Sequence, residues 1–258
     1  MWQPVVVGIF LALVLLGAVL LLLRQRASPA PPCVCYPTRY PKVLLGVRCM
    51  SLVFYTAVII AQFIEAGMVA EYVYYTFWNF NLQAIYFGWA IVASIVGSVD
   101  SHRRNTLFDV IFANSFLIAG VFWGVLYSPI YSVTWLHMSQ HGINSVLLVL
   151  EFGLNELRIQ PRSMVYASML LPDVFGAFAW VVRECWVDDW VYPFLDVTKD
   201  VALLWYIGML LGHCAFFGLA MGLSKLKAHW LRHAPPVSSP WLDAPLNDEE
   251  KDQPLRLV

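Results

Sequence analysis

Apolar stretches of about 20 residues recur along this chain, and they limit its fold more than any other feature of the sequence. A helix needs roughly 20 mostly apolar residues to cross the hydrocarbon core of a bilayer. The sequence contains seven candidates, at 4–23, 50–70, 78–98, 107–127, 142–157, 164–182 and 201–223. The fifth candidate is short and contains Glu151, so its limits are the least well defined.

Composition also indicates a membrane protein. The chain is 60% hydrophobic and only 13% charged, whereas soluble domains carry about 25% charged residues. We therefore predict an all-α, polytopic membrane helical bundle with about seven transmembrane helices, made of one N-terminal anchor and a six-helix core. The net charge of −1 and the lack of a basic stripe give no indication of a nucleic-acid partner.

Basic residues predict the orientation of the bundle. The first span is longer than the ~7–15-residue core of a signal peptide, and the sequence RQR follows it, so we interpret it as an anchor. Lys and Arg concentrate in 24–49, 99–106, 158–163 and the segment after 223, whereas loop 183–200 is acidic. Cytosolic loops carry the excess of basic residues. We expect an integral membrane protein of the endoplasmic reticulum or plasma membrane, with a non-cytosolic N-terminus and a cytosolic C-terminus.

The chain divides into four predicted parts. Residues 1–26 are the anchor, 27–49 a cytosolic Pro-rich linker, 50–225 the six-helix core and 226–258 a disordered, acidic cytosolic tail. Cys33 and Cys35 lie in the linker near a membrane helix, where they are either palmitoylated or plain reduced thiols. The cysteine spacing predicts neither a disulfide framework nor a metal site.

Two polar clusters lie at the non-cytosolic ends of predicted spans. Thr76 is in the first cluster and His141 is in the second, 65 residues later. A hydroxyl and an imidazole within reach of each other form a nucleophile and its base. Alternatively, both residues have structural roles, with Thr76 as a helix-capping or helix-packing residue and His141 as an interfacial residue.

Four blocks of sequence strengthen the catalytic interpretation. They are YYTFWNFNLQAIYFG (74–88), VFWGVLY (121–127), QHGINSVLLVLE (140–151) and WVYPFLD (190–196). Their order and spacing resemble those of the androgen-induced protein family, which includes the androgen-dependent TFPI-regulating protein and, more distantly, the rolling-stone proteins. The resemblance covers about residues 45–225.

The resemblance implies a multi-pass hydrolase that cleaves fatty acid esters of hydroxy fatty acids with a threonine nucleophile and a histidine. The family threonine block is similar to residues 75–77 and the histidine block to residues 140–144, which assigns the two roles to Thr76 and His141. Asn144 stands where the family has a second histidine, and the first span is an addition. The implied partner is a lipid substrate with acyl chains, without a cofactor or metal.

Further polar residues near the two clusters have candidate roles. Asn79 and Asn144 are candidate donors to the oxyanion that forms during ester hydrolysis, or they hydrogen-bond neighbouring helices. Trp78 and His213 are candidate substrate-binding residues. Glu65 or Asp173 would be a third group that orients His141, or a structural carboxylate. Pro172 is expected to kink the sixth span and open a polar cavity. Trp190, Tyr192 and Phe194 either cover the mouth of this cavity or form an interfacial belt.

Two other functions remain open from the sequence. His137 and His141 form an H-x-x-x-H pair, which a membrane metalloenzyme would complete with His213 and either Glu151 or Asp173. The third interpretation is a non-catalytic receptor or scaffold that resembles the rolling-stone proteins.

Overall fold

The computed structural model describes residues 2–27, 38, 40–67, 70–97, 102–128, 130, 132–155 and 157–233. Within these ranges the chain is all-α and contains no strand, as predicted. Cys33, Cys35 and most of the predicted acidic tail lie outside the described residues. The α-helices are α1 (Gln3–Ala27), α2 (Pro41–Ala66), α3 (Tyr75–Val96), α4 (His102–Val121), α5 (Trp135–Met138), α6 (Asn144–Leu154), α7 (Leu171–Cys185) and α8 (Ala202–His233).

Six helices of the described chain are long and apolar enough to cross a membrane. They are α1, α2, α3, α4 with its extension to Leu126, α7 with the segment from Pro161, and α8. The predicted fifth span, 142–157, coincides with α6, which continues α5 through a π-helical turn, Ser139–Ile143. This shorter segment is not among the six. The chain is thus a polytopic helical bundle of the predicted class.

Helix α2 begins nine residues before the predicted second span and inside the predicted linker. Pro41 stands in its first turn, where a missing N–H costs nothing, because the first N–H groups of a helix have no partner within it. Arg48 lies in segment 27–49, which the sequence predicted to be a cytosolic linker. In the structure Arg48 is buried and paired, so the helix runs through it.

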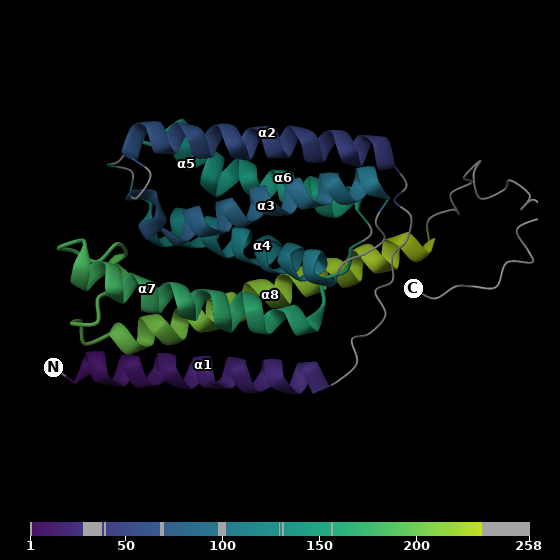
Figure 1. Cartoon of the computed structure of the whole chain (residues 1–258). Coiled ribbons are helices and arrows are strands. Elements are labelled where there is room, and N and C mark those ends of the chain that lie inside the picture. Colours follow the sequence, from purple (N-terminus) through teal and green to yellow (C-terminus); the bar gives the residue numbers. More distant parts are fainter. Residues whose placement is uncertain are drawn as a thin grey trace, which may run out of the picture.

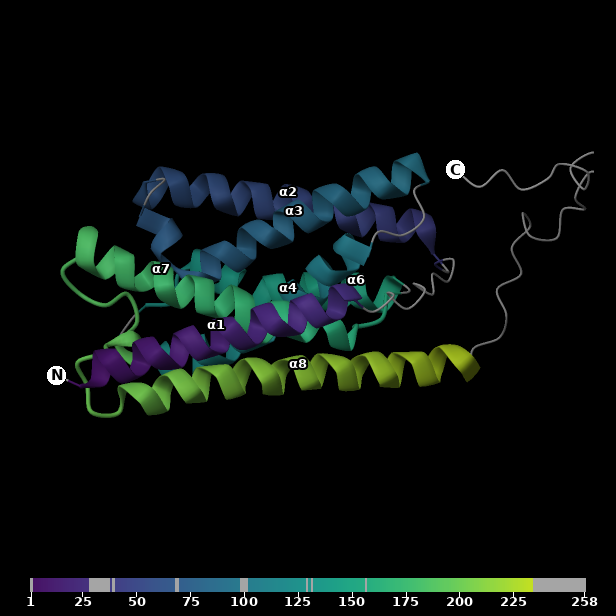
Figure 2. The same ribbon diagram turned by 60° about the horizontal axis from the view of Figure 1, so that its bottom comes forward.

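The bundle has two parts, and α1 lies on the outside of one of them. Helix α2 packs along α3 and α6, while α1 lies beside α7 and α8, on the side away from α2 (Figure 1). The rotated view keeps α1 against α7 and α8 (Figure 2). Small residues allow this close contact, since Gly8 faces the ring of Trp180 and Gly17 faces Met169.

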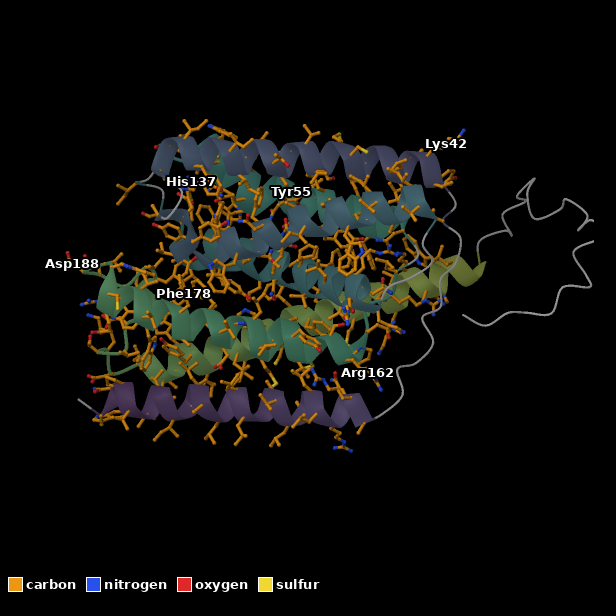
Figure 3. The ribbon with its side chains drawn as sticks, in the orientation of Figure 1. Lys42, Tyr55, His137, Arg162, Phe178 and Asp188 are labelled. Atoms are coloured by element: carbon orange, nitrogen blue, oxygen red, sulfur yellow. The ribbon has the colours of Figure 1, made fainter. Side chains whose placement is uncertain are left out.

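The fold separates charges between its two ends. The end where α1 finishes and α2 begins carries Arg24, Lys42, Arg104 and Arg162, and we call it the basic end. The other end, where α1, α3, α5 and α8 begin, contains a cavity lined by Thr76 and His141, and we call it the cavity end. Figure 3 shows Lys42 and Arg162 at the basic end and His137 and Asp188 at the cavity end. The segments that the sequence predicted to share one face of the membrane are therefore gathered at one end of the bundle.

A buried ion pair joins three helices near the basic end. Arg48 on α2 donates from Nε and Nη2 to the carboxylate of Glu151 on α6, with distances of 2.6–3.1 Å. The Tyr86 hydroxyl on α3 donates to the same carboxylate at 2.8 Å. Arg48 Nη1 also donates to the Ser94 hydroxyl at 2.6 Å. Glu151 is completely buried and Arg48 is 8% exposed, so each charge depends on the other.

We predict that breaking this pair strongly destabilises the bundle. Arg48→Met leaves the Glu151 charge buried without its partner, and such a loss costs about 3–5 kcal/mol. The midpoint of unfolding in an SDS titration, followed by far-UV circular dichroism, should fall accordingly. Lys199→Met is the control, because Lys199 pairs with Asp196 at the surface and its side chain is 66% exposed. Equal midpoints for the two variants would contradict the prediction.

Candidate active site

A mostly apolar cavity lies at the cavity end, between the two parts of the bundle. Its volume is about 100 Å³. Helices α1, α7 and α8 line one side of it, and α3, α4 and the turns that follow α4 and α5 line the other. Both Thr76 and His141 are among its lining residues, although 65 positions separate them in the sequence. His213 and Asp173 also line it.

Thr76 is the second residue of α3. The preceding residue in the chain, Tyr75, donates its backbone N–H to the Tyr192 hydroxyl at 3.1 Å. No side chain of the N-cap residue, Tyr74, caps this helix start, so the phenol of Tyr192 satisfies one of the N–H groups that a helix start leaves unpaired. Thr76 is partly exposed and lines the cavity at the positive end of the helix dipole.

Tyr192 contacts the candidate nucleophile directly. Burial raises the pKa of Tyr192 to about 12, and hydrogen bonds from the Thr76 side chain and from the backbone of Tyr75 and Thr76 oppose that rise. The phenol is therefore neutral at physiological pH. Because its oxygen accepts from the backbone of α3, its own proton is available to a group in the cavity.

His141 lies in the π-helical turn Ser139–Ile143, and its ring stacks on Phe122. The ring centroids are 3.7 Å apart and the planes are 3° from parallel. The residue is 7% exposed, and its Nδ1 atom has no hydrogen-bond partner among the described residues. Its backbone carbonyl accepts from Trp123 Nε1 at 2.9 Å, which holds the turn against the end of α4.

All three π-helical turns of the described chain contribute to the cavity wall. Phe122 belongs to the turn Phe122–Leu126, His141 to Ser139–Ile143, and Ser168 to Val165–Leu170. The last turn directly precedes Leu171 and Pro172; a proline lacks the N–H that an α-helical register would need. The kink predicted at Pro172 thus takes the form of a wider turn, which places Ser168 at the cavity. Wide turns of this kind often occur at functional sites.

The other predicted site residues divide into two groups. His213 lines the cavity, whereas Trp78, Asn79 and Asn144 do not. Asn144 Oδ1 accepts from the Ser145 backbone N–H at 2.7 Å, and Trp78 Nε1 donates to the Tyr72 carbonyl at 2.7 Å. Asn79 is 1% exposed and has no partner for its amide in the described chain. The cavity wall therefore holds neither of the two asparagines predicted as oxyanion donors.

Of the two carboxylates predicted to orient His141, only Asp173 lines the cavity. Asp173 is 6% exposed, and its Oδ1 atom has no partner among the described residues. Glu65 is exposed near the end of α2 and is not part of the wall.

The geometry gives no support to the metalloenzyme alternative. Within the described chain no three His, Cys, Asp or Glu side chains come together closely enough to hold a metal ion. His137 Nδ1 instead accepts from the Thr134 backbone N–H at 3.2 Å in a capping box at the start of α5. Glu151 is occupied by Arg48, as described above.

The comparison with protein families gives one match. Residues 43–228, which are most of the chain, match the model of the FAR-17a/AIG1-like protein family. The chain belongs to the FAR-17a/AIG1-like family. No curated protein and no solved structure matches it significantly. The family resemblance stated from the sequence is thereby confirmed.

The FAR-17a/AIG1-like region and the N-terminal helix build the cavity together. Thr76, His141, Tyr192 and His213 all lie inside the matched region, while α1 lies wholly outside it. Phe10, Leu11 and Val14 of α1 nevertheless belong to the cavity wall. Hydrogen bonds attach α1 at its two ends, from Gln3 to Asp200 at 2.9 Å and from Gln25 to the Arg162 carbonyl at 3.3 Å.

Two features of this site were not found from the sequence. Tyr192 was interpreted only as part of a cover or belt, and Ser168 was not singled out. The WVYPFLD block contained the signal for Tyr192, since a tyrosine in a loop otherwise devoted to apolar packing has a hydroxyl that needs a partner. Ser168 carries no comparable signal, because its exposure to the cavity results from the wide turn before Pro172.

We predict that Tyr192→Phe destabilises the start of α3 without changing the packing of the ring. The variant leaves the Tyr75 N–H buried without a partner, at a cost of about 1–3 kcal/mol. The thermal midpoint in detergent should fall relative to wild type. Tyr127→Phe is the matched control, because Tyr127 is 39% exposed. Unchanged midpoints in both variants would show that the phenol does not hold the helix start.

Proposed function

We propose that this FAR-17a/AIG1-like protein is an integral-membrane lipid-ester hydrolase with Thr76 as its nucleophile and His141 as its general base. The observation that carries the proposal is that these two side chains line one apolar cavity. Mostly apolar cavities with a few polar groups are typical ligand sites. The apolar wall suits an acyl chain, and the family resemblance favours fatty acid esters of hydroxy fatty acids.

The proposed reaction proceeds through an acyl-threonine. The Thr76 oxygen attacks the ester carbonyl carbon while His141 takes the hydroxyl proton. The tetrahedral intermediate collapses, the bond to the alcohol oxygen breaks, and His141 returns the proton to the departing alcohol. Water then adds to the acyl-threonine with the same proton transfers, which releases the fatty acid and restores Thr76.

The start of α3 favours the oxyanion through its helix dipole. The carbonyl oxygen becomes negative when Thr76 attacks, and the positive end of the α3 dipole stabilises a negative charge at that position. The Tyr192 hydroxyl lies at the same helix start and has a proton to donate. Tyr192 thus takes the role that the sequence analysis gave to Asn79 and Asn144.

The proposed reaction requires a rearrangement that brings the His141 ring to the Thr76 hydroxyl. No hydrogen bond joins Thr76 to His141 among the described residues, and the Nδ1 atom of His141 is unpartnered. Ligand-free sites often hold their catalytic groups farther apart than they are in the complex. The ring stack on Phe122 orients the imidazole, and movement within the π-helical turn would bring it to the hydroxyl.

The orientation in the membrane is also part of the proposal. The basic end faces the cytosol, because cytosolic loops are enriched in Lys and Arg. The cavity then opens at the non-cytosolic leaflet of the endoplasmic reticulum or plasma membrane, and the N-terminus lies on that side.

We expect Thr76→Ala to abolish hydrolysis of a fatty acid ester of a hydroxy fatty acid by purified protein. His141→Ala should lower kcat about a hundredfold or more, because a positioned base contributes roughly that factor. A fluorophosphonate probe should label wild type and Thr134→Ala but not Thr76→Ala. Thr134 is the control threonine, since it caps α5 at the same end of the bundle. Folded wild-type protein that neither reacts with the probe nor turns over ester would favour a receptor or scaffold.

The wall formed by α1 should set the accepted acyl chain. Val14→Trp fills the cavity from α1, so kcat/KM should fall for long acyl chains more than for short ones. Leu13→Trp is the matched control, because Leu13 is 63% exposed on the outer face of the same helix and is not part of the wall. A chain-length profile that both variants share with wild type would show that α1 does not contact the substrate.

A further inference from the structure

The inner part of the cavity wall holds polar atoms that the proposed reaction does not use. Ser168 Oγ, Asp173 Oδ1 and His213 Nε2 all lack a hydrogen-bond partner among the described residues. The three residues are 0%, 6% and 3% exposed, respectively. All of them line the cavity that contains Thr76. Buried polar atoms without partners are costly, and their presence in one cavity wall indicates a polar group of a ligand.

The depth of these residues separates them from the reacting groups. Asp173 lies 12 residues before the end of α7 at Cys185, and His213 lies 11 residues after the start of α8 at Ala202. Both ends belong to the cavity end, so Asp173 and His213 lie at similar depth. Thr76 is only the second residue of α3. The His213 ring packs against the ring of Tyr75, with centroids 5.8 Å apart, so a lipid with its ester at Thr76 reaches the inner polar atoms farther along its chain.

The hydrogen-bond donors and acceptors of Ser168, Asp173 and His213 indicate which kind of ligand group would bind between them. His213 Nδ1 lies 2.7 Å from the Met209 carbonyl, which only accepts, so Nδ1 carries the proton and Nε2 is an acceptor. The carboxylate oxygen of Asp173 is also an acceptor. Ser168 both donates and accepts. The set is rich in acceptors, so it suits a neutral donor such as a hydroxyl, and the carboxylate repels an anion.

We propose that Ser168, Asp173 and His213 form an inner subsite for a free hydroxyl group carried within the acyl chain of a lipid ester. The ligand hydroxyl donates to His213 Nε2 or Asp173 and accepts from Ser168. The subsite deepens the hydrolase function proposed above and rests on it for the position of the ester, but binding at the subsite requires no turnover. The subsite favours an acyl chain that carries a hydroxyl group over an acyl chain that carries a carboxylate.

The test measures binding in full-length Thr76→Ala, which separates recognition from hydrolysis. Three ligands compete with a fluorescent acyl ester: methyl stearate, methyl hydroxystearate with a mid-chain hydroxyl, and the monomethyl ester of the corresponding dicarboxylic acid. We expect the hydroxylated ester to bind about tenfold more tightly than the other two. Adding His213→Phe or Ser168→Ala should remove this preference and leave the affinity for methyl stearate unchanged.

Ser115→Ala is the matched control for Ser168→Ala. Ser115 is completely buried on α4, its hydroxyl donates to the Phe112 carbonyl, and it is not part of the cavity wall. This variant should retain the tenfold preference. Equal affinities for the three ligands, a tighter dicarboxylic monoester, or a preference that survives both subsite variants would overturn the proposal. Retained preference in a protein that never hydrolyses esters would instead refute the hydrolase function and leave the subsite standing.

Discussion

The buried pair of Arg48 and Glu151 holds the helices on which the two catalytic candidates are placed. Helices α3 and α6 run in the same direction, from the cavity end to the basic end. Tyr86 lies ten residues after Thr76, and Glu151 lies ten residues after His141. The hydrogen bond between Tyr86 and Glu151 therefore fixes the register of the two helices at a point equally far below the two candidates. Their common depth at the cavity follows from an interaction roughly 15 Å away, at a rise of about 1.5 Å per residue.

The cavity wall gathers several unpartnered polar atoms in one place. At the basic end Asp109 Oδ2 accepts from the Gln160 backbone N–H at 3.0 Å, and Lys227 donates to Asn155 Oδ1 at 3.0 Å. At the cavity His141, Ser168, Asp173 and His213 each keep an unpartnered atom, and single unpartnered atoms also occur elsewhere, as at Asp109 Oδ1. Lipid supplies no hydrogen bonds, so unpaired groups lower stability wherever they are buried. Four such groups around one cavity are understandable if a ligand provides their partners.

Much of this architecture could be predicted from the sequence, because a bilayer imposes a length and a polarity on every crossing helix. Six of the seven predicted spans and the basic end follow from that rule, and Thr76 and His141 line one cavity, as expected from their predicted common depth. The start of α2 did not, because Arg48 is tolerated only through Glu151, a residue 103 positions away. Asn79 and Asn144 were assigned to the oxyanion by their closeness in sequence to Thr76 and His141. Residues three positions apart are neighbours on a regular helix, but both side chains are absent from the cavity wall. Between His141 and Asn144 the π-helical turn Ser139–Ile143 changes the regular spacing.

The N-terminal helix contributes to the cavity from outside the matched region and brings no chemically reactive group. Helix α1 lies outside the matched residues and brings only apolar side chains to the wall. It cannot take part in proton transfer, but its side chains exclude lipid and water from the space beside Thr76 and the inner polar atoms. Electrostatic interactions strengthen where water is excluded. In the proposed reaction, an apolar helix in this position would therefore increase the influence of the α3 start and of Tyr192 on the charge at the ester, and it would limit which acyl chains enter.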